Sequence, residues 1–188
     1  MGFAELFILA IGLSMDAFAI SVSKGLTMAE AGFKKALVVG LYFGFFQAFM
    51  PVIGYFAATL FAEQIIAYDH WVAFGLLLFI GAKMIIGGFK KEESPGDESI
   101  SPGKMLPLAV ATSIDALAVG VSFAFLKTNI VFAVILIGVV TLILSVAGVK
   151  IGKVFGAKLK SKAEIAGGVI LILIGLKILL EHLGIINF

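Results

Sequence analysis

The sequence contains no cysteine and no arginine, and charged residues make up only 14% of its 188 positions. Without cysteine there is no disulfide framework and no thiolate-ligated zinc or iron–sulfur site. Without arginine there is no guanidinium group to clamp a carboxylate or phosphate through two parallel hydrogen bonds. A formal net charge of only +2 argues against a nucleic-acid-binding surface. The scarcity of charge also excludes an ordinary soluble domain, in which about 25% of residues are charged.

Apolar residues are abundant instead: they make up 61% of the chain, and the mean hydropathy is +1.16. A transmembrane helix needs about 20 mostly apolar residues, and six stretches meet that requirement. The alternating pattern of a transmembrane β-barrel is absent. The sequence therefore predicts an all-α bundle of six transmembrane helices. The predicted spans are Phe3–Ser23, Ala36–Phe61, Trp71–Phe89, Met105–Leu126, Ile130–Val149 and Ile165–Leu183.

The lysines divide unequally between the two sides of this bundle. Eleven of the 14 lie in the loops that follow the first, third and fifth spans. Because cytoplasmic loops carry the excess of Lys and Arg, these loops are predicted to be cytoplasmic and both termini to lie outside. The longest, residues 90–104, is rich in Ser, Pro, Gly and acidic residues, which is typical of a flexible polar linker. We therefore expect a multi-pass membrane protein, surrounded by lipid.

The segments on either side of this linker resemble each other. GLSMDAFAISVS at residues 12–23 aligns with ATSIDALAVGVS at residues 111–122, and the second and third spans of each half also align. Each half contains three spans, so the second copy must enter the membrane from the opposite side. Residues 1–89 and 105–188 are thus predicted to be two inverted three-helix repeats, an architecture of secondary transporters. The aligned polar pairs are Ser14 and Ser113, Asp16 and Asp115, Gln47 and Thr141, and Lys83 and Lys177.

Asp16 and Asp115 are predicted to lie near the centre of the bilayer. A carboxylate at that depth costs about 2.5–3.5 kcal/mol on insertion scales, and intramembrane acids commonly mark ion or proton pathways. The alternative is that each aspartate only makes a structural contact between helices. Small residues lie on the same helix faces, so we expect the two faces to meet and the two carboxylates to converge.

Two further groups of polar residues accompany the aspartates. Carboxylate, hydroxyl and carbonyl oxygens suit a hard divalent cation such as Mg²⁺, Ca²⁺ or Mn²⁺, and no His or Cys lies at that depth. Lys83 and Lys177 are either counter-charges that pair with the aspartates or long side chains that reach the membrane surface. The candidate metal ligands are Asp16 and Asp115, with Ser14, Gln47, Thr112, Ser113 and Thr141 as supporting polar residues.

The paired motifs SMDAFAISVSKG (14–25) and ATSIDALAVGVS (111–122) resemble those of the bacterial manganese efflux pump family MntP, within the lysine-exporter superfamily. The resemblance covers essentially the whole chain. It implies export of Mn²⁺ from the cytoplasm, with Asp16 and Asp115 central to transport. Mn²⁺ is then the transported substrate and not a resident cofactor, and the protein is not an enzyme.

Export of a cation also needs an energy source. Moving one charge against the membrane potential costs about 2.3 kcal/mol per 100 mV, and a divalent ion costs about twice that. No Walker-type loop is present to use a nucleotide, so we expect proton-coupled alternating access. The alternatives are a transporter of another divalent cation or of a small amino acid, and an intramembrane aspartyl protease, whose G-x-G-D sequence is missing. The sequence leaves the oligomeric state open.

Overall fold

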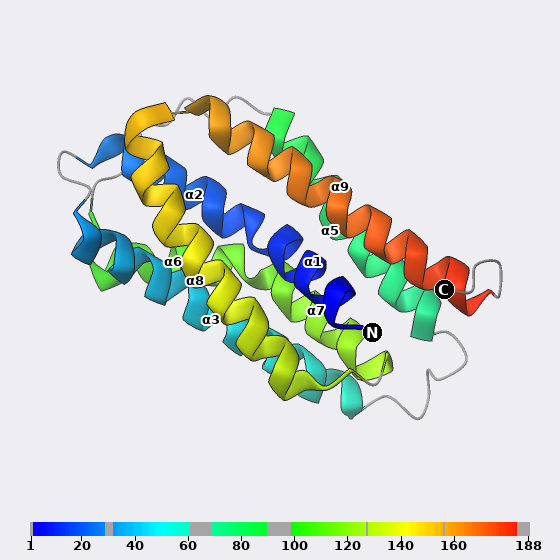
Figure 1. The fold of residues 1–188 in the computed structure, drawn as a ribbon. Helices are drawn as coiled ribbons and strands as arrows, with labels where there is room; N and C mark the ends of the chain where they lie inside the picture. Colours follow the sequence, from blue (N-terminus) through cyan, green and yellow to red (C-terminus); the bar gives the residue numbers. More distant parts are fainter. Residues whose placement is uncertain are drawn as a thin grey trace.

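The structure is a computed structural model that describes residues 2–28, 32–60, 69–89, 99–126, 128–155 and 157–183. Within these ranges the regular elements are all α-helices and none is a strand, which confirms the all-helical prediction. Together they form an elongated bundle (Figure 1). The helices are α1 (Phe3–Leu13), α2 (Met15–Thr27), α3 (Phe33–Thr59), α5 (Asp69–Phe89), α6 (Pro102–Thr112), α7 (Ile114–Phe125), α8 (Ile130–Phe155) and α9 (Ala157–His182).

Several of these helices are suited to a lipid bilayer. Among the described residues, Phe3–Leu26, Phe33–Thr59 and Ile130–Lys153 are each long and apolar enough to cross a membrane. A fourth candidate consists of α6 and α7, which are bent by 41° where they join. Helices of this length and composition indicate a membrane protein. The count of six spans stays a prediction.

Helices α8 and α9 are longer than the predicted spans. Helix α8 continues to Phe155 and α9 begins at Ala157, so helix also covers most of the predicted connection at residues 150–164. Lys and Ala, which are strong helix formers, are frequent in this segment. The two helices therefore extend beyond their apolar stretches.

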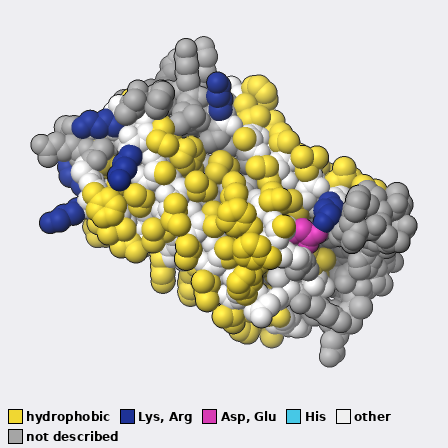
Figure 2. Space-filling view, viewed as in Figure 1, with side chains coloured by type: hydrophobic (Ala, Val, Ile, Leu, Met, Phe, Trp, Pro, Cys, Tyr) yellow, Lys and Arg dark blue, Asp and Glu magenta, His cyan; other side chains and the backbone are white. Residues whose placement is uncertain are grey.

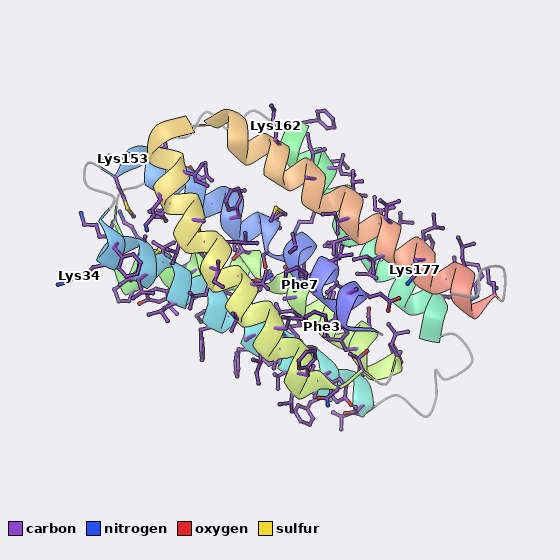
Figure 3. All side chains as sticks on the ribbon, viewed as in Figure 1. Phe3, Phe7, Lys34, Lys153, Lys162 and Lys177 are labelled. Atoms are coloured by element: carbon purple, nitrogen blue, oxygen red, sulfur yellow. The ribbon has the colours of Figure 1, made fainter. Side chains whose placement is uncertain are left out.

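The ends of the bundle differ in charge. Lys34 and Lys153 lie at one end, which we call the lysine-rich end, and Lys177 lies toward the other (Figure 3). In Figure 2 most of the visible lysines gather at the lysine-rich end, and apolar side chains cover the middle of the molecule. Helices α1 and α2 run toward the lysine-rich end, whereas α6 and α7 run away from it (Figure 1). The start of α1 and the end of α9 both lie toward the opposite end.

The helices of one half pack mainly on helices of the other half. Helix α2 packs against α8, and α7 packs against α3, while α3 and α8 also pack against each other. Helices α5 and α9 form a further pair along one side of the bundle (Figure 1). We predicted that the small-residue faces of the two motif spans meet directly. Among the described residues, α2 instead packs mainly on α8, and α7 packs mainly on α3.

Glycines allow these helices to approach closely. A Cβ on Gly54 of α3 would lie 2.0 Å from the Leu117 carbonyl oxygen of α7, and one on Gly152 of α8 would lie 2.1 Å from the Val22 carbonyl oxygen of α2. Any side chain at either position would force the backbones apart. Small residues at helix interfaces are the usual means of close packing in membranes.

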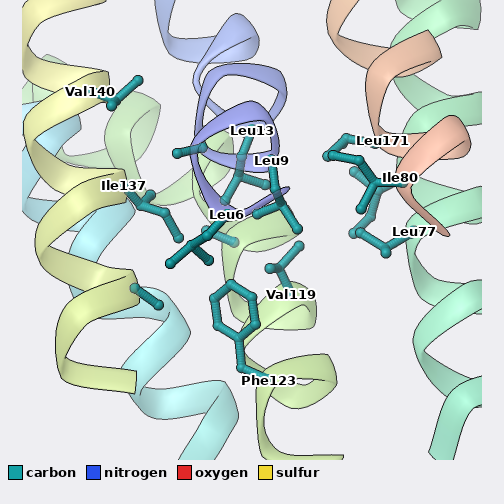
Figure 4. Packing of buried hydrophobic residues seen from close by; sticks show 14 residues of the cluster. Leu6, Leu9, Leu13, Leu77, Ile80, Val119, Phe123, Ile137, Val140 and Leu171 are labelled. Carbon is teal, nitrogen blue, oxygen red and sulfur yellow. The ribbon is translucent and has the colours of Figure 1, made fainter. Parts of the chain in front are cut away.

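A cluster of buried apolar side chains joins the two halves of the chain. Leu6, Leu9 and Leu13 of α1 pack in one cluster with Val119 and Phe123 of α7 (Figure 4). Residues of α5, α8 and α9 complete the same cluster. On the outside, large apolar side chains are exposed, as expected for surfaces that face lipid tails. They include Phe45 (62%), Phe79 (69%) and Val131 (64%).

Candidate functional site at two helix breaks

Each motif serine interrupts its helix. Ser14 separates α1 from α2, and Ser113 separates α6 from α7. Both side chains are fully buried. Because Asp16 and Asp115 each follow two residues later, both aspartates lie in the first turn of a new helix.

Hydrogen bonds of the serine hydroxyls explain these breaks. The Ser113 hydroxyl lies 2.8 Å from two acceptors, the Ala109 carbonyl and Oε1 of Gln47, so its single proton is shared between them. The Ser113 N–H donates to the Val110 carbonyl (3.1 Å) in place of the usual helical acceptor. The Ser14 hydroxyl donates to the Ala10 carbonyl (2.6 Å), but there the N–H also keeps its bond to Ala10 (3.0 Å). Serine bonding to the preceding turn bends helices. Because Ser113 also loses its normal backbone bond, the bend is stronger in the second half.

The second span of each half reaches the break of the other half. Thr141 of α8 lies 2.7 Å from the Ser14 hydroxyl. Since the Ser14 proton is directed to Ala10, Thr141 donates to Ser14. Gln47 of α3 donates from Nε2 to the Leu13 carbonyl (2.9 Å) and accepts through Oε1 from Ser113 (2.8 Å). The structure thus brings four of the five predicted supporting residues into contact in these two pairs.

Asp115 is a buried carboxylate with spare capacity for a ligand. Its side chain is 5% exposed, and Oδ1 accepts from the Ala116 N–H (2.8 Å). The other oxygen, Oδ2, is buried and has no hydrogen-bond partner among the described residues. A buried polar atom without a partner is costly, so the atom points to a ligand or a proton that completes it.

Asp16 is half-buried and lies within electrostatic reach of Asp115. The two negative charges repel each other, so a cation near both would remove the repulsion. Among the described residues no group of three or more Asp, Glu, His or Cys side chains gathers at one point. A site based on these two carboxylates would therefore need hydroxyl, amide or carbonyl oxygens as further ligands.

The two lysines differ from each other. Lys83 of α5 is exposed, and its positive charge acts on Asp115. Lys177 of α9 forms an ion pair with Glu5 of α1. In this structure the described carboxylate partner of Lys177 is therefore Glu5, a residue that was not among the candidates.

Thr112 does not join the hydrogen bonds that link the two breaks. Its hydroxyl donates back to the carbonyls of Leu108 (3.0 Å) and Ala109 (3.1 Å) on its own helix. This satisfies the hydroxyl locally.

Sequence reasoning missed two polar residues. Glu5 lies within the first apolar stretch, so its place near a span end was a usable signal, but its partner lies 172 residues away. Ser145 of α8 is fully buried, and its hydroxyl has no hydrogen-bond partner among the described residues. The sequence feature that could have identified Ser145 is its position one helical turn after Thr141.

Helices that can cross a bilayer, with carboxyl, hydroxyl and amide groups buried between them, define a multi-span membrane protein with a polar site inside the bundle. The profile of the family Mntp, described as "Putative manganese efflux pump", matches residues 30–179. The chain belongs to this family, which confirms the resemblance carried by its paired motifs.

Individual relatives match along their whole length. A protein of Desulfitobacterium hafniense (strain Y51) is 55% identical over 100% of this chain and 99% of its own. One of Acetivibrio thermocellus is 51% identical over 100% and 96%, and one of Bifidobacterium adolescentis is 49% identical over 97% and 98%. All three are named "Putative manganese efflux pump MntP", which describes a transporter and agrees with the expected non-enzymatic role. No solved structure matches the chain significantly.

Proposed function

We propose that the protein is a secondary transporter that exports Mn²⁺ from the cytoplasm, with Asp16 and Asp115 as its cation site. Mn²⁺ is the substrate named for the family and for its relatives. The single observation that carries the site is the buried Asp115 carboxylate, with its unpartnered Oδ2 and the Asp16 charge within electrostatic reach. Oxygen ligands of this kind suit Mn²⁺.

The proposed mechanism is alternating access of two inverted three-helix repeats, residues 1–89 and 105–188, joined by the cytoplasmic linker 90–104. Two observations support it. The helix breaks fall at aligned serines, and α1–α2 and α6–α7 run in opposite directions (Figure 1). Cross-contacts also match, since α2 packs on α8 as α7 packs on α3. Repeats that exchange their shapes would open the site first to one side and then to the other.

The proposed location is the bacterial plasma (inner) membrane, with the lysine-rich end in the cytoplasm and both termini outside. The excess of lysines at one end supports this orientation. Export then works against the membrane potential, by about 4.6 kcal/mol per 100 mV for a divalent ion. Protons that replace the metal on the aspartates would supply this energy as they enter the cell.

The first test is manganese accumulation in cells that lack their own exporter. Cells with the native protein should retain less manganese than cells without it. Asp16→Asn and Asp115→Asn should each abolish the difference, because an amide is a much weaker metal ligand than a carboxylate. Lys34→Gln is the matched control, since it removes a charge from the exposed lysine-rich end and should leave export unchanged. Equal manganese in cells with and without the native protein would refute the proposal.

Proton coupling needs a separate test in vesicles that contain the purified protein. Collapse of the pH gradient with an ionophore should slow Mn²⁺ movement at a fixed membrane potential. Unchanged transport after the collapse would exclude protons as the coupling ion, while Mn²⁺ export itself would stand.

A further inference from the structure

Gln47 is a side chain whose hydrogen bonds reach both helix breaks. Its Nε2 donates to Leu13, the last residue of α1, and its Oε1 accepts from Ser113, between α6 and α7. The Leu13 carbonyl can only accept a hydrogen bond, so the amide orientation is fixed with Nε2 toward Leu13. Both ends of the amide are therefore used, each on a different half of the chain.

Helix α3, which carries Gln47, packs closely against α8 near this residue. Gly44, one turn earlier on α3, is so close to α8 that a Cβ on it would lie 2.9 Å from the Gly138 carbonyl oxygen. Thr141, at the aligned position of the other half, has a shorter side chain, and its described hydrogen bond goes only to Ser14. The connection between the breaks is thus asymmetric and depends on the longer amide.

We propose that Gln47 is a positioning residue that couples the two aspartate-bearing segments, so that a shift at one helix break is transmitted to the other. Asp16 lies three residues after Leu13, and Asp115 lies two residues after Ser113. Movement of either break changes the position of its aspartate. The role in transport rests on the proposed function, but the coupling itself can be measured without transport.

Hydrogen exchange of the purified protein tests this coupling. Asp16→Asn should change the exchange rate of the backbone amides at residues 113–116 by at least about fivefold, a usual size for coupling between sites. In a Gln47→Met background, which keeps the length but not the hydrogen bonds, the same substitution should change it by less than about twofold. Gln47→Glu, which cannot donate to Leu13 when ionised, replaces the Met variant if that variant does not fold. Equal changes in the two backgrounds would overturn the proposal.

Transport kinetics give a second readout. Gln47→Met should lower the maximal rate of Mn²⁺ transport by about tenfold and change KM by less than about twofold. The reason is that it removes the coupling between the two aspartate-bearing segments and leaves both proposed metal ligands in place. Thr141→Val, which removes a bond to only one break, should lower the rate less. If the native protein moves no Mn²⁺, the proposed function fails, whereas the exchange experiment still decides the coupling.

A separate observation concerns the end of the bundle opposite the lysine-rich end. There the Glu5–Lys177 ion pair holds α1 against α9, and the side chains are 25% and 39% exposed respectively. Extension of the motif alignment places Lys104 opposite Glu5, and Lys83 is already aligned with Lys177. Two lysines cannot form an ion pair, so Lys83 and Lys104 cannot make the equivalent contact with each other.

We infer that the Glu5–Lys177 pair is a gate that keeps the outer side of the transporter closed. Leu171 of α9 lies beneath this gate. It is fully buried, and its Cδ2 lies 3.3 Å from the point that a Cβ on Gly12 of α1 would occupy. Leu171 precedes Lys177 by six residues, or about 9 Å along the helix axis. Access to Leu171 from outside therefore requires α1 and α9 to separate.

The absence of native cysteine allows a direct test. Leu171→Cys is labelled in oriented vesicles with a membrane-impermeant maleimide on the outer face, and Ile170→Cys is the second reporter. Glu5→Gln or Lys177→Gln should each raise the labelling rate about two- to fivefold, as expected for loss of a partly exposed ion pair. Exchange of the two charges, Glu5→Lys with Lys177→Glu, should restore slow labelling. Lys34→Gln is the matched control, because it removes a charge from the exposed lysine-rich end. Equal rates in all variants would overturn the gate, and this readout does not depend on Mn²⁺.

Discussion

The two halves of the protein carry the same motif in different local shapes. In the first half, Phe3–Leu26 still qualifies as one continuous span, whereas in the second half α6 and α7 are bent by 41°. Asp16 is half-buried, while Asp115 is 5% exposed. The two aligned segments share 6 of their 12 residues, including both the serine and the aspartate, yet they adopt two geometries. The shared motif alone therefore does not determine the local shape.

The largest difference between the halves should appear at the aspartates. Asp16→Asn and Asp115→Asn should both abolish Mn²⁺ export, but only Asp115→Asn should stabilise the protein, by about 1–2 kcal/mol. The reason is that it removes a carboxylate that is buried without full hydrogen bonding. Thermal unfolding in detergent measures the stability, with Lys34→Gln as the reference variant. Equal stability of the two aspartate variants would show that their surroundings do not differ as described.

The helix contacts at aligned glycines should also differ between the two halves. Gly54→Ala should destabilise the protein by about 3 kcal/mol, because a Cβ there would lie 2.0 Å from a backbone oxygen. Gly148→Ala, at the aligned position, should cost about 1 kcal/mol, since its nearest contact would be 3.0 Å. Gly75→Ala is the control, because nothing lies within 4 Å of its Cβ position. Thermal unfolding of the three variants checks the order, and equal losses at residues 54 and 148 would contradict it.

The serine breaks should differ by a smaller amount. Ser113→Ala should cost about 2 kcal/mol, because it leaves the buried Oε1 of Gln47 without a donor. Ser14→Ala should cost about 1 kcal/mol, because the Thr141 hydroxyl that loses its acceptor can rotate to a carbonyl of its own helix. Denaturation of both variants beside the native protein measures these values. A larger loss of stability for Ser14→Ala than for Ser113→Ala would contradict the conclusion that the break at Ser113 has the stronger hydrogen bonds.

The Glu5–Lys177 ion pair should contribute least to stability. Lys177→Gln should lower the free energy of unfolding by less than about 1 kcal/mol, because its ion pair with Glu5 is partly exposed. Lys34→Gln, at an exposed lysine of the lysine-rich end, should have no measurable effect. Thermal unfolding at low and high salt checks both, and the difference between them should shrink at high salt if the pair is the cause.

The sequence alone predicted the helical class, which the structure confirms in the described residues. Composition and hydropathy suffice for the class because apolar runs of about 20 residues have few alternatives to a membrane helix. The six spans and the metal-ligand roles stay predictions. The repeated motif predicted that Ser14 and Ser113 are equivalent, and the structure places both at helix breaks. The family followed from the same motif and is confirmed by the relatives.

The details that sequence reasoning missed depend on contacts between distant residues. The break at Ser113 arises when one hydroxyl takes the Ala109 carbonyl, which no hydropathy window records. The Glu5–Lys177 pair joins opposite ends of the chain. The packing of α2 on α8 depends on glycines such as Gly152, whose effect is visible only when the partner backbone is known.

The interlocked packing of the halves also has a consequence for biogenesis. The principal partners of α1, α2, α3 and α5 all belong to residues 102–183. During synthesis the first helices therefore enter the membrane before their partners exist, with buried polar groups such as that of Gln47 still unmatched. Such a chain assembles late and as a unit, and a ribosome that stalls in the linker leaves an intermediate open to quality-control proteases.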